Sequence, residues 1–175
     1  MPDDPRLPDD TLRLRDGTAL GVRPLTADDA PALVDLFDHL TPEDVRARFF
    51  VTLRALPPAL LERLSHPDRE RELALAALCP DAPDRLCGVV RLSTDAEDRR
   101  RAEFAVVVRS DWKRRGLGRA LVEEIVRRAR ERGLRELYGA ILADNDAMIA
   151  LARRLGFAIA ADHGDARLVI ARRTL

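Results

Sequence analysis

The sequence has few aromatic residues, few cysteines and no long hydrophobic run. Aromatic residues make up 4% of the 175 residues, and two cysteines occur. No apolar stretch approaches the roughly 20 residues that a membrane-spanning helix needs, so we expect no membrane association. Two cysteines are also too few for the framework of a disulfide-rich protein. We therefore predict that Cys79 and Cys87 are buried, reduced thiols of a cytoplasmic protein.

A net charge is also absent, but the charges are unevenly distributed. The 30 basic and 30 acidic residues balance, and with so few aromatic residues this disfavours nucleic acid as a partner. Residues 109–135 nevertheless contain ten Lys or Arg against four Asp or Glu. A basic segment around a glycine turn favours an anionic ligand. His39, His66 and His163 lack the spacing of metal ligands, so we predict no metal site.

The first ten residues, MPDDPRLPDD, differ from the rest of the chain. They hold four Asp and three Pro and no apolar stretch, so we predict a disordered tail over residues 1–10 and not a secretory signal. Residues 11–175 contain no internal repeat or obvious linker and have the length of one domain. The sequence therefore predicts a single domain after a short acidic tail.

Hydrophobic patterns and turn residues predict a mixed α/β sheet. A hairpin is expected around Asp16-Gly17, and helices are expected after Thr26, Thr41 and Pro57. Three strands of an antiparallel meander should follow, at residues 73–79, 85–92 and 102–108. The remaining expected elements are a helix at 116–132, a strand at 136–142, a helix at 145–155 and strands at 157–161 and 167–171.

The most informative segment is a basic turn that begins the helix at 116–132. It reads Lys113-Arg-Arg-Gly-Leu-Gly118 and follows a strand. The start of a helix leaves backbone N–H groups without internal partners and carries partial positive charge. Glycines let this backbone approach a phosphate closely. We therefore predict a pyrophosphate site formed by Lys113, Arg114, Arg115, Gly116, Leu117, Gly118, Arg119 and Ala120.

Two common nucleotide motifs do not match this turn. Leu121 stands where the Rossmann pattern G-x-G-x-x-G requires its third glycine, and the turn follows a meander instead of the first strand of the chain. The Gly-Lys-Ser/Thr of a P-loop is absent. NAD and ATP therefore fit the sequence poorly.

The turn resembles the acetyl-CoA motif of the GNAT superfamily of N-acetyltransferases, Q/R-x-x-G-x-G/A, with Lys113 at its first position. Asn145–Phe157 is similar to the N-x-x-A-x-x-L-Y-x-x-x-G-F helix of that superfamily. Four further matches resemble the acetyltransferase domain of bacterial Pat-type protein lysine acetyltransferases: Asp16-Gly-Thr18, Arg48-Phe-Phe50, Ala102–Val108 and Leu151–Phe157. The resemblance implies an α/β fold of the GNAT type. Its mainly antiparallel central sheet is splayed at the cofactor strand, commonly by a bulge, and helices cover both faces.

The resemblance also implies roles for individual residues. Acetyl-CoA would be the co-substrate, with its pantetheine arm paired to the main chain of Val106, Val107 and Val108. Asn145 would either bind the pantetheine amides or only cap its helix. Glu103 is the candidate general base; the alternative is an exposed strand residue paired with an arginine such as Arg91. Ala152 occupies the position of the tyrosine that often protonates the leaving thiolate, and the sole tyrosine, Tyr138, is expected in the core.

The function that follows from the resemblance is direct transfer of acetyl from acetyl-CoA to an amine. A protein lysine is the favoured acceptor. A small-molecule amine is the alternative, and a non-catalytic acyl-CoA sensor is a third hypothesis because the tyrosine is missing. The sequence leaves a homodimer open and does not specify the acceptor.

Overall fold

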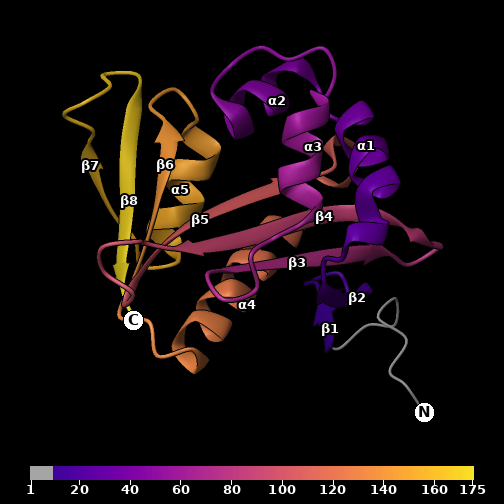
Figure 1. The fold of residues 1–175 in the computed structure, drawn as a ribbon, viewed down its shortest axis with the longest axis horizontal. Coiled ribbons are helices and arrows are strands. Elements are labelled where there is room, and N and C mark those ends of the chain that lie inside the picture. Colours follow the sequence, from indigo (N-terminus) through magenta and orange to yellow (C-terminus); the bar gives the residue numbers. More distant parts are fainter. Residues whose placement is uncertain (1–9) are drawn as a thin grey trace.

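Eight strands form one mixed sheet in the computed structural model, which describes residues 10–175. Their spatial order is β1-β2-β3-β4-β5-β6-β8-β7 (Figure 1). Neighbouring strands are antiparallel except for β5 and β6, which are parallel. The predicted mixed α/β class with a mainly antiparallel sheet is confirmed. The strands are β1 (Asp10–Arg13), β2 (Ala19–Pro24), β3 (Glu72–Cys79), β4 (Ala82–Thr94), β5 (Arg101–Val108), β6 (Glu136–Leu142), β7 (Ala158–Ala161) and β8 (Leu168–Thr174).

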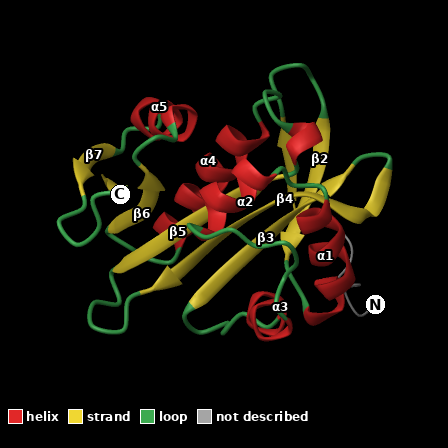
Figure 2. Ribbon diagram, turned by 90° about the horizontal axis from the view of Figure 1, so that it is seen from above, coloured by secondary structure: helices red, strands yellow, loops and turns green. Residues whose placement is uncertain are grey.

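Helices cover both faces of this sheet, as expected (Figures 1 and 2). One face carries α1 (Ala30–Asp38) and α3 (Pro58–Ser65), and α2 (Pro42–Phe49) lies beside β5. The other face carries α4 (Leu117–Glu131) and α5 (Asp146–Arg154). The start of α2 follows the sequence signals closely: Pro42 is the first helical residue, and the hydroxyl of Thr41 accepts a hydrogen bond from the N–H of Asp44 at 3.2 Å.

The helix α4 fixes the position of the basic turn. Its apolar stripe includes Leu117, Leu121, Val122 and Ile125, which are at most 1% exposed and pack in the main core cluster. A β-carbon at Gly88 on β4 would lie 2.9 Å from Leu121 Cδ1, so this glycine lets the helix approach the sheet closely. Burial of this stripe holds the first turn of α4 against the end of β5.

The sheet opens between β5 and β6. These strands pair over only three residues, from Arg101↔Glu136 to Glu103↔Tyr138. Beyond that point β6 continues along β8 and β5 continues along β4. The splayed sheet expected from the resemblance is therefore present.

Phe104 lies at the fork between these strands. Its ring packs on Phe157, with centroids 5.1 Å apart, and a β-carbon at Gly139 would lie 2.9 Å from Phe104 Cε1 and 3.0 Å from its main-chain oxygen. We expect Gly139→Ala to lower the free energy of unfolding by about 1–3 kcal/mol, because the added methyl overpacks the fork. Chemical denaturation would measure this change. Gly164→Ala is the control, because its nearest contact is an ordinary 3.6 Å; equal stability of the two variants would contradict the role of Phe104.

Three sequence expectations need correction. Cys79 and Cys87 are not reduced: they form a disulfide across the β3–β4 hairpin, with Cα atoms 5.2 Å apart. The spacing of the two cysteines in the sequence does not predict this disulfide, because only the turn between β3 and β4 brings them together. The bulge expected in β5 is also absent, since its register with β4 is unbroken from Gly88↔Val108 to Thr94↔Ala102. Asp10 begins β1, whereas the rest of the predicted tail, residues 1–9, lies outside the described residues.

Candidate active site

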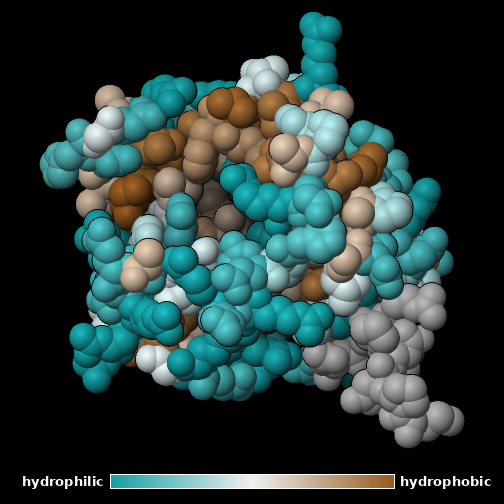
Figure 3. All heavy atoms as spheres, viewed as in Figure 1, coloured by the Kyte–Doolittle hydropathy of each residue, from teal (hydrophilic) through white to brown (hydrophobic). Residues whose placement is uncertain are grey.

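A cleft of about 860 Å³ opens where β5 and β6 diverge. Its walls come from β5, from the loop and first turn of α4, and from α2, β6 and α5. Figure 3 shows a hollow with apolar walls on this face of the molecule. The splay, which leaves one edge of β5 without a neighbouring strand, thus creates the main cleft described here.

The cleft collects nearly all the residues predicted from the sequence. Ala120 is the exception: it does not line the cleft, and its N–H donates to Gly116 O at 3.0 Å as the first hydrogen bond of α4. It therefore has no free donor for a ligand. The predicted residues that line the cleft are Glu103, Val106, Val107, Val108, Lys113, Arg114, Arg115, Gly116, Leu117, Gly118, Arg119 and Asn145.

The first turn of α4 presents backbone donors to the cleft. Gly116 is the N-cap, with φ +87°, and no side chain caps the helix. The N–H groups of Leu117, Gly118 and Arg119 precede the first internal hydrogen bond and so lack helical partners. Arg114 also has a positive φ, +63°, which is uncommon for a residue with a side chain. The loop therefore lines the cleft with backbone N–H groups and the positive end of the helix dipole, an arrangement suited to an anion.

An acidic and an aromatic side chain hold two of the basic residues around this loop. Lys113 Nζ forms an ion pair with Asp44 of α2, which also accepts a hydrogen bond from Ser110 Oγ. Burial acts to raise the pKa of Asp44, but the bonds from Lys113 and Ser110 outweigh it and hold the pKa below its usual value. The Arg115 guanidinium stacks on Trp112, 3.9 Å from the ring centroid, which places Trp112 under the loop.

The open edge of β5 continues the site away from the helix. Its residues Phe104–Val108 pair with β4 on one side but have no strand on the other. Main-chain groups alternate in direction along a strand, so part of them faces the cleft and can pair with an extended ligand. A β-carbon at Gly118 would lie 3.6 Å from Val108 Cγ2, which shows how closely the helix start abuts the end of β5. The cleft therefore suits a ligand that has an anionic group at the basic loop and an extended arm along β5. Coenzyme A has this shape and charge.

Glu103 lies at the inner end of this open edge. It is the last β5 residue paired with β6, and its side chain is exposed to the cleft. Desolvation by its surroundings raises its pKa above the ordinary value; the Arg48 charge opposes this rise and Asp95 adds to it. Among residues 10–175 no ion pair joins Glu103 to Arg91, which donates to the main-chain oxygen of Leu64 instead. A carboxylate with a raised pKa in a cleft is suited to accept a proton.

No tyrosine reaches the cleft from Ala152, the position of the family tyrosine, or from Tyr138. Ala152 is buried in the core at 1% exposure. Tyr138 is half-buried, and its hydroxyl donates to Asp95 Oδ1 at 2.6 Å. Burial and this hydrogen bond raise the pKa of Tyr138 to about 12. Asn145 lines the cleft but its side-chain oxygen caps α5, accepting from the N–H of Met148 at 3.1 Å.

Sequence reasoning missed several residues that line the cleft. Asp44 resembles any acid in the first turn of a helix, and only the fold brings it to Lys113, 69 positions along the chain. Arg15 and Asp16 reach the cleft from the β1–β2 turn, and Arg154 reaches it from the end of α5. Asp16 and Arg154 lie in motifs that resemble the acetyltransferase domain, but those motifs do not place either side chain at a ligand, because these contacts depend on long-range packing.

Comparisons with known proteins agree with this geometry. Residues 34–157 match the model of the acetyltransferase (GNAT) family. An acetyltransferase of Pseudomonas aeruginosa is 31% identical over 163 residues, which cover 93% of this chain and 87% of that protein. The crystal structure of the GNAT domain of S. lividans PAT has a TM-score of 0.87 at 29% identity, covering 95% of this chain and 96% of that one. A phosphinothricin acetyltransferase from Sinorhizobium meliloti, solved in complex with AcCoA, shares the fold at 22% identity, with a TM-score of 0.68 and coverage of 89% and 88%.

Proposed function

Because the chain belongs to the acetyltransferase (GNAT) family and is an acetyl-CoA-dependent N-acetyltransferase, we propose that its acceptor is a protein lysine and that Glu103 is the base. The role of Glu103 as the base rests on its position in the cleft, at the inner end of the open β5 edge. Support for a lysine acceptor is the resemblance of the motifs, among them Arg48-Phe-Phe50, to Pat-type protein lysine acetyltransferases.

Two features of the cleft would fit the diphosphate and the pantetheine arm of the co-substrate. The first turn of α4 would hold the diphosphate through the N–H groups of Leu117, Gly118 and Arg119. The open edge of β5 at Val106–Val108 would pair with the pantetheine arm. Bound in this way, acetyl-CoA supplies an activated acetyl thioester at the inner end of the cleft.

Glu103 would prepare the acceptor. A lysine ammonium has an ordinary pKa of about 10.4 and must lose a proton before its nitrogen can attack. Glu103 would take that proton, directly or through a water molecule. The amine nitrogen then forms a bond to the acetyl carbon while the carbon–sulfur bond breaks. The sulfur leaves with the bonding pair, and the second proton of the nitrogen passes to it through water, which yields the neutral amide and the free thiol. Water is the carrier because Tyr138 is bound to Asp95 outside the cleft.

An acetylation assay tests the function. The protein would be mixed with acetyl-CoA and either cell-extract proteins or a panel of small amines, with thiol release and acetyl-lysine measured by absorbance and mass spectrometry. We expect thiol release that depends on added protein and new acetyl-lysine on the acceptors. Turnover with small amines only would overturn the lysine proposal. Binding of acetyl-CoA without thioester consumption in the presence of any of these amines would indicate a non-catalytic sensor instead of an enzyme.

A further inference from the structure

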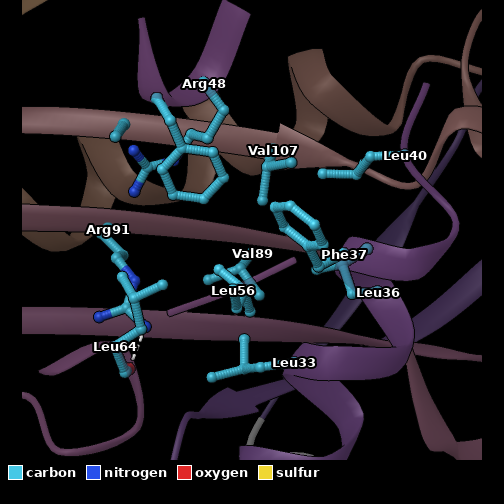
Figure 4. A pocket seen from close by; sticks show the side chains of 12 residues that line it. Leu33, Leu36, Phe37, Leu40, Arg48, Leu56, Leu64, Val89, Arg91 and Val107 are labelled. Atoms are coloured by element: carbon cyan, nitrogen blue, oxygen red, sulfur yellow. Dashed lines mark hydrogen bonds between the residues drawn. The ribbon is translucent and has the colours of Figure 1, made fainter. Parts of the chain in front are cut away.

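A second, smaller cavity adjoins the cleft on the face covered by α1 and α3. It has a volume of about 30 Å³ and is lined mainly by apolar side chains, with two arginines among them. Figure 4 shows Arg48 and Arg91 together at one end of this cavity, with Leu36, Phe37 and Leu40 at the other. Arg48 lines both this cavity and the main cleft, so it connects them.

The two arginines are poorly compensated. Both are partly buried, and desolvation lowers the pKa of each, that of Arg91 to about 10. Each feels further positive charge: Arg63 acts on both, and Arg48 acts on Arg91. Glu103 and Glu72 oppose them through space, and the Arg48 guanidinium lies 5.0 Å from the centroid of the Phe49 ring. Within residues 10–175, however, Arg48 makes no hydrogen bond or ion pair, and Arg91 donates only to Leu64 O. Desolvated cations without anionic partners are costly, and an incoming anion would relieve that cost.

The direction of β5 places these arginines beside the reacting amine. Alternate residues of a strand share a face, so Glu103, Ala105 and Val107 lie on the side covered by α1–α3. Ala105 and Val107 line the small cavity, and Glu103 lines the cleft beside Arg48. An acceptor whose amine reaches Glu103 therefore has its neighbouring groups next to Arg48 and then Arg91.

We propose that Arg48 and Arg91 form an anion subsite of the acceptor, so that the acetylated amine is one that carries a carboxylate close by. This inference rests on the proposed N-acetyltransfer at Glu103. Two sources supply the same chemistry: an acidic residue flanking a lysine in a peptide, and the carboxylate of a free amino acid. Guanidinium forks bind carboxylates through paired hydrogen bonds, which gives the subsite its selectivity.

Matched acceptors test the subsite. One arm uses short peptides with a central lysine flanked either by Glu or by Gln, and the other uses an amino acid and its carboxamide; kcat/KM is measured for each. We expect the wild type to favour the carboxylate member of at least one pair by about tenfold or more. Arg91→Gln should abolish that ratio. Arg69→Gln, which removes an exposed arginine outside both cavities, should keep it.

The ratio of kcat/KM between the carboxylate acceptor and its neutral partner distinguishes a loss of specificity from a general loss of folded enzyme. Arg91→Lys retains a positive charge at the site and should keep part of the preference, and coenzyme A affinity checks that each variant is folded. The arm that shows the preference identifies the source of the carboxylate. Equal kcat/KM for both members of each pair, or an unchanged ratio in folded Arg91→Gln, would overturn the anion subsite while leaving N-acetyltransfer intact. No turnover with any acceptor would contradict the proposed function and the subsite with it.

Discussion

Replacing Glu103 by glutamine is expected to lower kcat by about 100- to 10,000-fold, the usual contribution of a general base. Glutamine keeps the shape of the side chain but cannot accept the amine proton. Because Glu103 is exposed and makes no hydrogen bond or ion pair with the other described residues, we expect the melting temperature and coenzyme A affinity to stay unchanged. Steady-state rates of thiol release would measure the effect.

The pH dependence should identify the same residue. Only the ionised carboxylate can accept a proton, so the rate should fall as the pH drops through the pKa of Glu103. Desolvation raises that pKa, so the loss should occur at higher pH than an ordinary glutamate would give. The acidic limb should be absent in Glu103→Gln. Glu97→Gln is the control, because Glu97 is exposed and outside the cleft; a Glu103→Gln enzyme with near-wild-type turnover would remove Glu103 from the mechanism.

A second large effect is expected at Gly116, where a substitution can add one negative charge to the proposed diphosphate site. We expect Gly116→Asp to bind coenzyme A about tenfold to 100-fold more weakly than Gly116→Asn, because its carboxylate repels the diphosphate. Both side chains tolerate a positive φ better than most, and no atom lies within 4 Å of a β-carbon built at Gly116. The two variants therefore differ mainly in charge.

Calorimetric titration of both variants would measure this difference. The difference in coenzyme A affinity between the two variants should become smaller as the salt concentration increases, because screening weakens an exposed charge–charge interaction. It should also disappear when the ligand is pantetheine, which lacks the diphosphate. Equal affinities of the two variants for coenzyme A at low salt would place the diphosphate elsewhere.

Local signals in the sequence predict most of the elements. The strand predicted at 136–142 matches β6 (Glu136–Leu142), and the helix predicted at 116–132 matches α4 (Leu117–Glu131) within one residue at each end. The helix has a strong hydrophobic period and lies between Gly116 and Gly133, and the strand is a short, mainly apolar run. Each is therefore largely specified by its own residues. None of the helices formed by residues 10–175 is long and apolar enough to cross a membrane.

Long-range packing accounts for what the sequence did not predict. The insertion of β8 between β6 and β7 depends on pairing between distant segments. The Cys79–Cys87 disulfide and the ion pair between Asp44 and Lys113 depend on how strands and helices meet. The proximity of Arg48 and Arg91 also depends on long-range packing, because α2 and β4 bring these two residues to one cavity.

We propose that the backbone N–H groups at the start of α4 hold the diphosphate of coenzyme A and so place the co-substrate in the cleft. Isothermal titration of the wild-type protein with coenzyme A tests it most directly. We predict saturable binding to one site per chain, weakened by added salt and by Gly116→Asp. A folded protein that gives no saturable heat with either coenzyme A or acetyl-CoA would contradict the assignment of this cleft.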